Sequence, residues 1–329
     1  MRRGIIYVVL GMALVLEGSL FVSSEWMAER DVLSFVSTTS EDRPIILMDT
    51  QGEVLEELIT EQGHPYAFTW SPDRRWIAYE VCRNANCEIH VMEVRTNVIR
   101  VVHRQLTFGG DNRSPAWAPN GKWIAFVSER AGDKDIYRMH VDGENVIQLT
   151  QQGNCNEPNW SPDSQWIAFV SNATLFLMDA EGKDLRQLGE AGAVLFECTW
   201  SRNGKQIAFI GADAEGDIEI FSIDVDGENL RQLTRSQEQT FIWELVWSPS
   251  GKSIAYIVTQ LPKGPVNQIF AKAVVHIVDT VGGDGGKPIE ATRDLAPRYL
   301  SWLPEDFLSV SPSAEKQMTF WGGLKKTGK

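Results

Sequence analysis

Short apolar runs recur along this chain at a regular spacing, and polar turn residues separate them. The clearest unit runs from Trp117 to Phe126: a Trp, the turn Ala-Pro-Asn-Gly-Lys, and then Trp-Ile-Ala-Phe. Further copies begin at Trp70, Trp160, Trp200 and Trp247, and a decayed copy begins at Trp302. Successive Trp positions are 47, 43, 40, 47 and 55 residues apart. A period of roughly 40–50 residues with several strand signals per unit predicts a β-propeller with one four-stranded blade per unit.

Each unit has the composition of a β-hairpin. Pro fixes φ in the turn, Asp or Asn bonds to its own backbone, and Gly tolerates a positive φ. The following Ile-Ala-Phe or Ile-Ala-Tyr starts the next strand with a small residue between two large ones. We expect the Trp to end the first strand and to fill the space between neighbouring blades.

The two ends of the repeat region predict a shared blade. Val32–Val36, Ile45–Met48 and Val54–Ile59 read as strands two to four of a blade that has no first strand, and Arg298–Trp302 reads as that strand. Such sharing closes the ring and leaves no exposed strand edge. We therefore predict an all-β fold, a six-bladed β-propeller of four-stranded antiparallel blades over residues 30–310.

A second repeated phrase supports a family resemblance. The pattern Asp-Gly-x-Asn-x-x-Gln-Leu-Thr occurs at residues 142–150 and 226–234. Together with the Trp units, it resembles the TolB-like six-bladed propellers of the PD40, or WD40-like repeat, family. The resemblance implies an exported protein. We expect the N-terminal α/β domain of TolB to be absent, because only some 30 residues precede the first strands.

Both ends of the chain differ from the repeats. Residues 1–24 join Arg2 and Arg3 to an apolar run and small residues, the plan of a signal peptide. The apolar stretch is also long enough to act as an uncleaved N-terminal anchor, the only membrane contact we expect. Residues 311–329 carry four Lys and predict a flexible basic tail.

The net charge and the cysteines indicate in which compartment the protein resides and which classes of partner it can bind. The formal net charge is −13, which argues against a nucleic-acid partner because phosphate binding needs clustered Lys and Arg. Cys82 and Cys87 bracket a short hairpin-like loop, and we expect a disulfide there. For Cys155 and Cys198 both a disulfide and two buried thiols stay open. Together these features predict a periplasmic or secreted protein, which we expect to be a monomer.

Candidate binding residues lie just before the repeated Trp, where each innermost strand begins. Three positions before it, consecutive units carry Glu157, Glu197 and Glu244, and the last unit carries Tyr299. Four positions before it stand Tyr66, Arg113, Phe196, Trp243 and Arg298. Aromatic residues and Arg often dominate interface energies, so these nine positions form a candidate recognition surface for a protein or peptide. The acidic residues can also satisfy backbone amides at the strand starts, or gather oxygens for a hard cation.

We favour a non-catalytic protein-interaction module of the cell envelope, without a cofactor or a metal. No Gly-x-Ser-x-Gly nucleophile motif occurs in the sequence. The alternative is a propeller enzyme, or a protein that binds carbohydrate or another small ligand in the central channel.

Overall fold

The computed structural model describes residues 31–41, 43–58, 65–84, 86–94, 102–188, 194–235, 240–260, 273–281 and 286–303. The predicted signal or anchor segment, 1–24, and the predicted tail, 311–329, lie outside these ranges. Within them, no helical segment has both the length and the apolar character needed to cross a bilayer.

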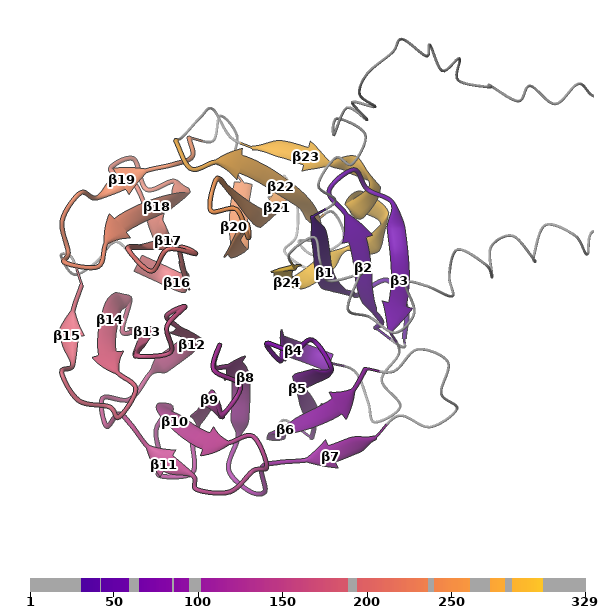
Figure 1. The fold of residues 1–329 in the computed structure, drawn as a ribbon. Helices are drawn as coiled ribbons and strands as arrows, with labels where there is room; N and C mark the ends of the chain where they lie inside the picture. The colour runs from indigo at the N-terminus through magenta and orange to yellow at the C-terminus, as the bar shows by residue number, and fades with distance from the viewer. Residues whose placement is uncertain are drawn as a thin grey trace, which may run out of the picture. The chain divides into compact units, whose positions relative to one another are not determined.

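Six four-stranded sheets form a ring around a central axis (Figure 1). A short 3-10 helix, η3 (Glu290–Leu295), precedes the last strand. The strands are β24 (Pro297–Leu303), β1 (Val32–Ser37), β2 (Ile45–Asp49) and β3 (Val54–Leu58) in blade 1; β4 (Pro65–Trp70), β5 (Trp76–Arg83), β6 (Asn86–Glu93) and β7 (His103–Gln105) in blade 2; β8 (Asn112–Trp117), β9 (Trp123–Ser128), β10 (Asp135–His140) and β11 (Ile147–Gln148) in blade 3; β12 (Cys155–Trp160), β13 (Trp166–Ser171), β14 (Thr174–Asp179) and β15 (Arg186–Gln187) in blade 4; β16 (Val194–Trp200), β17 (Gln206–Ala212), β18 (Ile218–Asp224) and β19 (Arg231–Gln232) in blade 5; β20 (Thr240–Trp247), β21 (Ser253–Gln260), β22 (Ala273–Asp279) and β23 (Lys287–Ile289) in blade 6.

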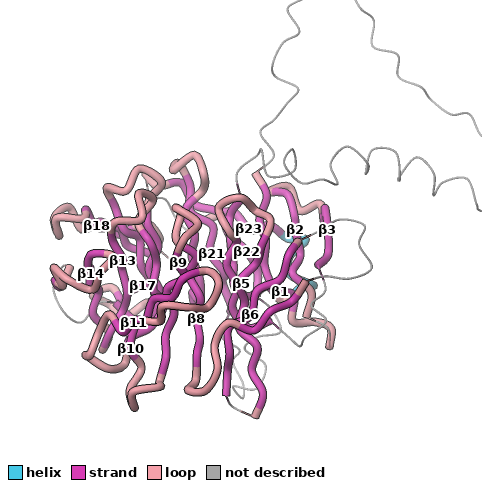
Figure 2. The backbone as a smooth tube through the Cα atoms, turned by 60° about the horizontal axis from the view of Figure 1, so that its bottom comes forward, coloured by secondary structure: helices cyan, strands magenta, loops and turns pink. Residues whose placement is uncertain are grey.

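Every blade runs from the centre of the ring outward in antiparallel steps, with the strands close to the ring axis in direction (Figure 2). Because the strands alternate in direction, the hairpins fall on two faces. The innermost strands end at the Trp-containing turns, on what we call the turn face. They begin on the opposite side, which we call the mouth face. The predicted six-bladed all-β fold is confirmed.

The Trp that ends an innermost strand joins its blade to the preceding one. In blades 2, 4 and 5 its indole N–H donates a hydrogen bond across the blade boundary, which satisfies a buried polar group that would otherwise be costly. The bonds run from Trp70 Nε1 to Ser34 Oγ (3.0 Å), from Trp160 Nε1 to the Ala116 carbonyl (3.2 Å), and from Trp200 Nε1 to the Asn159 carbonyl (3.0 Å).

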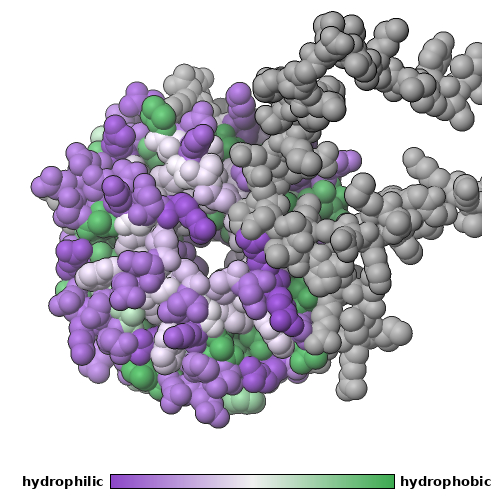
Figure 3. Space-filling model, in the orientation of Figure 1, coloured by the Kyte–Doolittle hydropathy of each residue, from purple (hydrophilic) through white to green (hydrophobic). Residues whose placement is uncertain are grey.

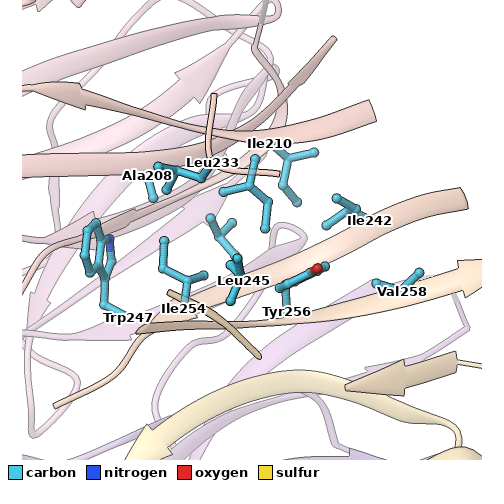
Figure 4. Packing of buried hydrophobic residues seen from close by; sticks show 11 residues of the cluster. Ala208, Ile210, Leu233, Ile242, Leu245, Trp247, Ile254, Tyr256 and Val258 are labelled. Atoms are coloured by element: carbon cyan, nitrogen blue, oxygen red, sulfur yellow. The ribbon is translucent and has the colours of Figure 1, made fainter. Parts of the chain in front are cut away.

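Apolar side chains fill the spaces between blades. Between blades 5 and 6, Ile210 and Leu233 pack in one buried cluster with Ile242, Leu245 and Trp247 (Figure 4). The small Ala208, which lies between two large residues of its strand, lets the facing sheet approach closely. The Ile-Ala-Phe pattern is thus a packing device, and burial of these side chains supplies most of the stabilisation.

The Gln-Leu-Thr phrase fixes the outermost strand. Thr150 Oγ1 donates to Asp135 Oδ1 (2.8 Å) and accepts the Ile136 N–H (2.9 Å). Thr107 with Glu88, and Thr234 with Glu219, repeat this arrangement in blades 2 and 5. Each Thr therefore ties the end of the outer hairpin to the start of the third strand.

The cysteines divide into one bonded pair and two thiols. Cys82 and Cys87 face each other across the β5–β6 hairpin and form a disulfide, with an S–S distance of 1.99 Å. Cys155 and Cys198 are buried free thiols on β12 and β16. Burial raises the pKa of the Cys198 thiol.

Ring closure rests on β24, which pairs with β1 from Val32–Leu303 to Ser37–Pro297. Deleting residues 297–310 should therefore lower the melting temperature far more than deleting residues 312–329, because it removes the buried Trp302 and Leu303 and exposes the β1 edge. We expect a cost of several kcal/mol, on the scale of about 2 kcal/mol for each large side chain. Thermal unfolding of both truncations checks this, and equal shifts would contradict the closure.

Candidate functional site

A β-bulge interrupts each innermost strand three residues before its Trp. In blade 4, Asn156 pairs with Val170 and Asn159 pairs with Ala168, so two residues of β12 stand opposite one of β13. The other innermost strands shift register at the matching place. Ser114, Glu157 and Tyr299 have positive φ angles of 49°, 46° and 58° there. These left-handed conformations cost energy in residues other than Gly, and bulges commonly redirect side chains at functional sites.

The bulges surround a cavity of about 520 Å³ at the centre of the ring. All six innermost strands line it, and a central opening is visible in the space-filling view (Figure 3). A space of this size is typical of a ligand pocket, and it also admits a few residues of a peptide. Six of the nine predicted recognition residues line it: Glu157, Glu197, Glu244, Trp243, Arg298 and Tyr299.

The three glutamates of this cavity repel one another. Burial within the ring, with the charges of Glu244 and Glu157, raises the pKa of Glu197 well above its usual value. Burial raises the pKa of Glu244 to about 7, against hydrogen bonds from the backbone of Tyr299 and Leu300 and the charge of Arg298. Burial also raises the pKa of Glu157, although its side chain is in contact with the open channel. A cation that enters the cavity would stabilise all three in their ionised forms.

These carboxylates also hold the neighbouring bulges. Glu244 Oε2 accepts the Leu300 N–H at 2.6 Å, and Ser114 Oγ donates to Glu157 Oε1 at 3.2 Å. The Leu245 N–H donates to Glu197 and opposes the rise in its pKa. The expectation that these glutamates satisfy strand-start amides thus describes part of their role, and the same side chains still line the cavity.

Glu80, which is not among the nine residues expected from the sequence, belongs to the same network. Glu80 lies on β5, is only 4% exposed, and accepts the Ser114 N–H at 3.0 Å. Burial raises its pKa to about 7, against that hydrogen bond and the charge of Arg113. A comparison of the repeat copies distinguishes Glu80 in the sequence. Val127, Val170, Ile210 and Ile257 occupy this position in the other Ile-Ala-Phe or Ile-Ala-Tyr copies, and only this copy has a carboxylate.

Arg298 and Trp243 form a stacked pair across the boundary between blades 6 and 1. The Arg298 guanidinium lies 4.7 Å from the centre of the Trp243 ring. Trp243 Nε1 donates to Thr259 Oγ1 at 3.0 Å, which fixes the ring. A planar cation held by an aromatic face is well suited to contact a peptide.

Two predicted recognition residues that the structure describes, Arg113 and Tyr66, are not part of the cavity lining. Arg113 pairs with Asp111 (2.6 Å) and Glu80 (3.5 Å) beside it. Tyr66 lies under the Arg43 guanidinium, 5.0 Å from its ring centre. The side chain of Phe196 lies outside the described residues.

One group of potential metal ligands occurs within the described ranges: Glu80, Cys82 and Cys87, whose ligand atoms lie within 4.8 Å of one another. The two sulfur atoms are bonded to each other and so are not thiolates, the form that binds metal. Asp111 links this stapled hairpin to the network, because its Oδ1 accepts the Cys87 N–H at 2.8 Å.

Glu80→Gln should make stability less dependent on pH. The unfolded carboxyl loses its proton near pH 4.5 and the folded one near 7, so between these values the folded state binds more protons and stability falls as pH rises. The decrease in the free energy of unfolding between pH 5 and pH 8 should be smaller in the variant by about 2 kcal/mol. Urea unfolding at several pH values measures it. Glu228→Gln, on an exposed turn, is the control, and identical profiles for the wild type and Glu80→Gln would contradict the assignment.

Solved structures share this fold. TolB from Acinetobacter baumannii has a TM-score of 0.64 and 19% identity over 84% of this chain and 67% of its own. An Agrobacterium tumefaciens protein assigned to TolB has a TM-score of 0.59 and 17% identity over 84% of this chain and 99% of its own. A chain of the nidogen/laminin complex has a TM-score of 0.59 and 12% identity, over 83% and 98%. No curated protein matches the sequence.

The family model PD40, described as the TolB beta propeller domain, matches residues 12–174 and 151–276. These two matches together span most of the chain and contain five of the six Trp units. The chain therefore belongs to the PD40 family of TolB-type β-propellers.

Proposed function

We propose that this propeller is an exported, non-catalytic interaction module of the cell envelope, and that its central cavity binds a segment of a partner protein. The observation that carries the proposal is the cavity lining: blades 4, 5, 6 and 1 present three mutually repelling glutamates and an Arg stacked on a Trp. The partner segment carries a cationic group, because three carboxylates face one Arg. Its aromatic or aliphatic neighbours pack against Trp243.

Compartment and relatives support the same proposal. A disulfide such as Cys82–Cys87 persists in oxidising compartments outside the cytosol. TolB-type chains share the fold, and a propeller of the same fold occurs in a complex of nidogen with laminin. The proposed location is the periplasm or the extracellular space.

Raised carboxyl pKa values also suit acid–base chemistry, the main competing function. We favour partner binding because Glu244 and Glu157 are already held by groups of neighbouring blades. A carboxylate that accepts fixed hydrogen bonds is less free to transfer a proton.

Replacing Glu157, Glu197 and Glu244 together with Gln should weaken capture of the partner from native envelopes at least tenfold, about 1.4 kcal/mol or more. The melting temperature should change by no more than a few degrees, because Gln still accepts the bulge hydrogen bonds. The matched control replaces three exposed turn residues, Glu53, Glu144 and Glu228, with Gln. Equal recovery of one stoichiometric protein by all three baits would refute the site. Recovery of no protein, with turnover of a glycan by the wild type only, would favour the enzymatic alternative.

Binding should strengthen as pH rises from 6 to 8. The cavity carboxyls are protonated below their raised pKa values, that of Glu244 being about 7, and only the ionised forms attract a cation. The captured partner should therefore bind the wild type more tightly at pH 8, and the triple Gln variant should show no such gain. Affinity that is flat or falls with pH in the wild type would argue against a cationic segment.

A further inference from the structure

A second cavity, of about 500 Å³, lies on the turn face between blades 2 and 3. We call it the blade 2–3 groove. Trp76, Val91 and Val141 contribute to its walls, with Pro72 and Pro119 from the two Trp-containing turns. Asp73, Arg104 and Asp142 are the charged residues of its lining. None of these residues belongs to the central cavity.

The neighbouring boundary, between blades 3 and 4, shows what fills an equivalent space. There Arg138 of β10 is only 3% exposed, and its guanidinium lies 4.2 Å from the centre of the Trp123 ring. Its Nη1 donates to the Ala180 carbonyl (2.7 Å) and to Glu181 Oε1 (2.8 Å), and its Nη2 donates to Glu181 Oε2 (3.0 Å). One arginine thus stacks on an indole and forms a two-bond fork with a carboxylate.

Strand register identifies the residue that replaces this arginine in blade 2. Arg138 pairs with Ala125 of β9, and Val91 pairs with Ala78 of β5. Both alanines are the middle residue of their Ile-Ala-Phe or Ile-Ala-Tyr copy. Val91 in blade 2 is therefore the structural equivalent of Arg138 in blade 3. Its side chain ends at two methyl groups, so it offers neither a cation to the indole ring nor a hydrogen-bond donor to the carboxylate of the next blade.

The groups that Arg138 contacts nevertheless have counterparts in the blade 2–3 groove. Trp76 corresponds to Trp123. The Val141 carbonyl corresponds to the Ala180 carbonyl, and the Asp142 carboxylate corresponds to the Glu181 carboxylate. Arg104 of β7 donates to the Val141 carbonyl at 3.1 Å and so replaces one of the three hydrogen bonds. Of the guanidinium groups in the described ranges, none is stacked on Trp76.

Charge in the groove favours a cation. Asp142 receives the Glu144 N–H, and its Oδ2 lies 2.8 Å from His140 Nδ1. Asp73, whose Oδ1 accepts the Ser71 hydroxyl at 2.6 Å, adds a second carboxylate. Two exposed carboxylates and an open indole face therefore line a space that an arginine fills one blade away.

We propose that the blade 2–3 groove binds an arginine side chain supplied by a partner protein. The guanidinium stacks on Trp76 and bonds to Asp142, as Arg138 does on Trp123 and Glu181. The remaining volume, lined by Pro72 and Pro119, accommodates the residues on either side of that arginine. This site is separate from the central cavity and does not depend on the function proposed for it.

The probe is N-acetyl-arginine N-methylamide, titrated into the full chain while the indole NMR signals are followed. The Trp76 signal is assigned with Trp76→Phe. A saturable shift with a Kd of about 1 mM is expected for one stacked and paired guanidinium. The neutral citrulline analogue of the same shape should bind at least tenfold more weakly. Equal binding of both analogues, or no saturable Trp76 shift with the arginine analogue, would overturn the proposal.

Variants test the position directly. Val91→Arg should fill the groove from within the chain, abolish the Trp76 shift and preserve or raise the melting temperature. Val91→Leu is the matched control, because blade 4 has Leu177 at this position, and it should retain binding. If Val91→Arg does not fold, Asp142→Asn, on an exposed side chain, should still weaken binding at least fivefold, and unchanged binding would overturn the proposal. The triple Gln variant of the central cavity should bind the probe normally, and loss of binding there would place the arginine in the channel instead.

Discussion

The pairing of β24 with β1 is the constraint on which the rest of the structure depends. Within blade 1, strands from the two ends of the repeat region share a sheet, so β1 is paired on both sides. Each blade can then pack against two neighbours, and the indole N–H of Trp70 reaches Ser34 across the blade 1–2 boundary, as those of Trp160 and Trp200 reach a carbonyl of the preceding blade. The central cavity exists only because this closure holds six innermost strands around one axis.

Closure also produces the electrostatics of the cavity. Bulges at matching positions direct one residue of each innermost strand toward the axis, and three consecutive blades place a glutamate there. Converging carboxylates repel one another and lose hydration, which raises their pKa values. The partner binding that we propose would relieve this cost, while the same carboxylates also accept structural hydrogen bonds.

The sequence predicts the ring well because its repeats are local. The Trp117–Phe126 unit specifies a hairpin by turn chemistry and alternation, and the decayed copy at Trp302 already indicates the shared blade. The three glutamates were found for the same reason, since equal spacing from the repeated Trp places them at equal positions. Glu80 and the blade 2–3 groove were missed because both depend on pairing between strands and on contacts across a blade boundary. Only the strand register shows that Val91 occupies the position that Arg138 occupies in the next blade.

Site-specific photocrosslinking in intact envelopes tests the central claim most directly. A photoreactive residue at Ala67, which lines the central cavity, is compared with one at Glu228 on an exposed outer turn. If the cavity receives a partner segment, the Ala67 position should give a single crosslinked protein that the Glu228 position does not. No crosslinked protein from Ala67, or the same product from both positions, would contradict the account.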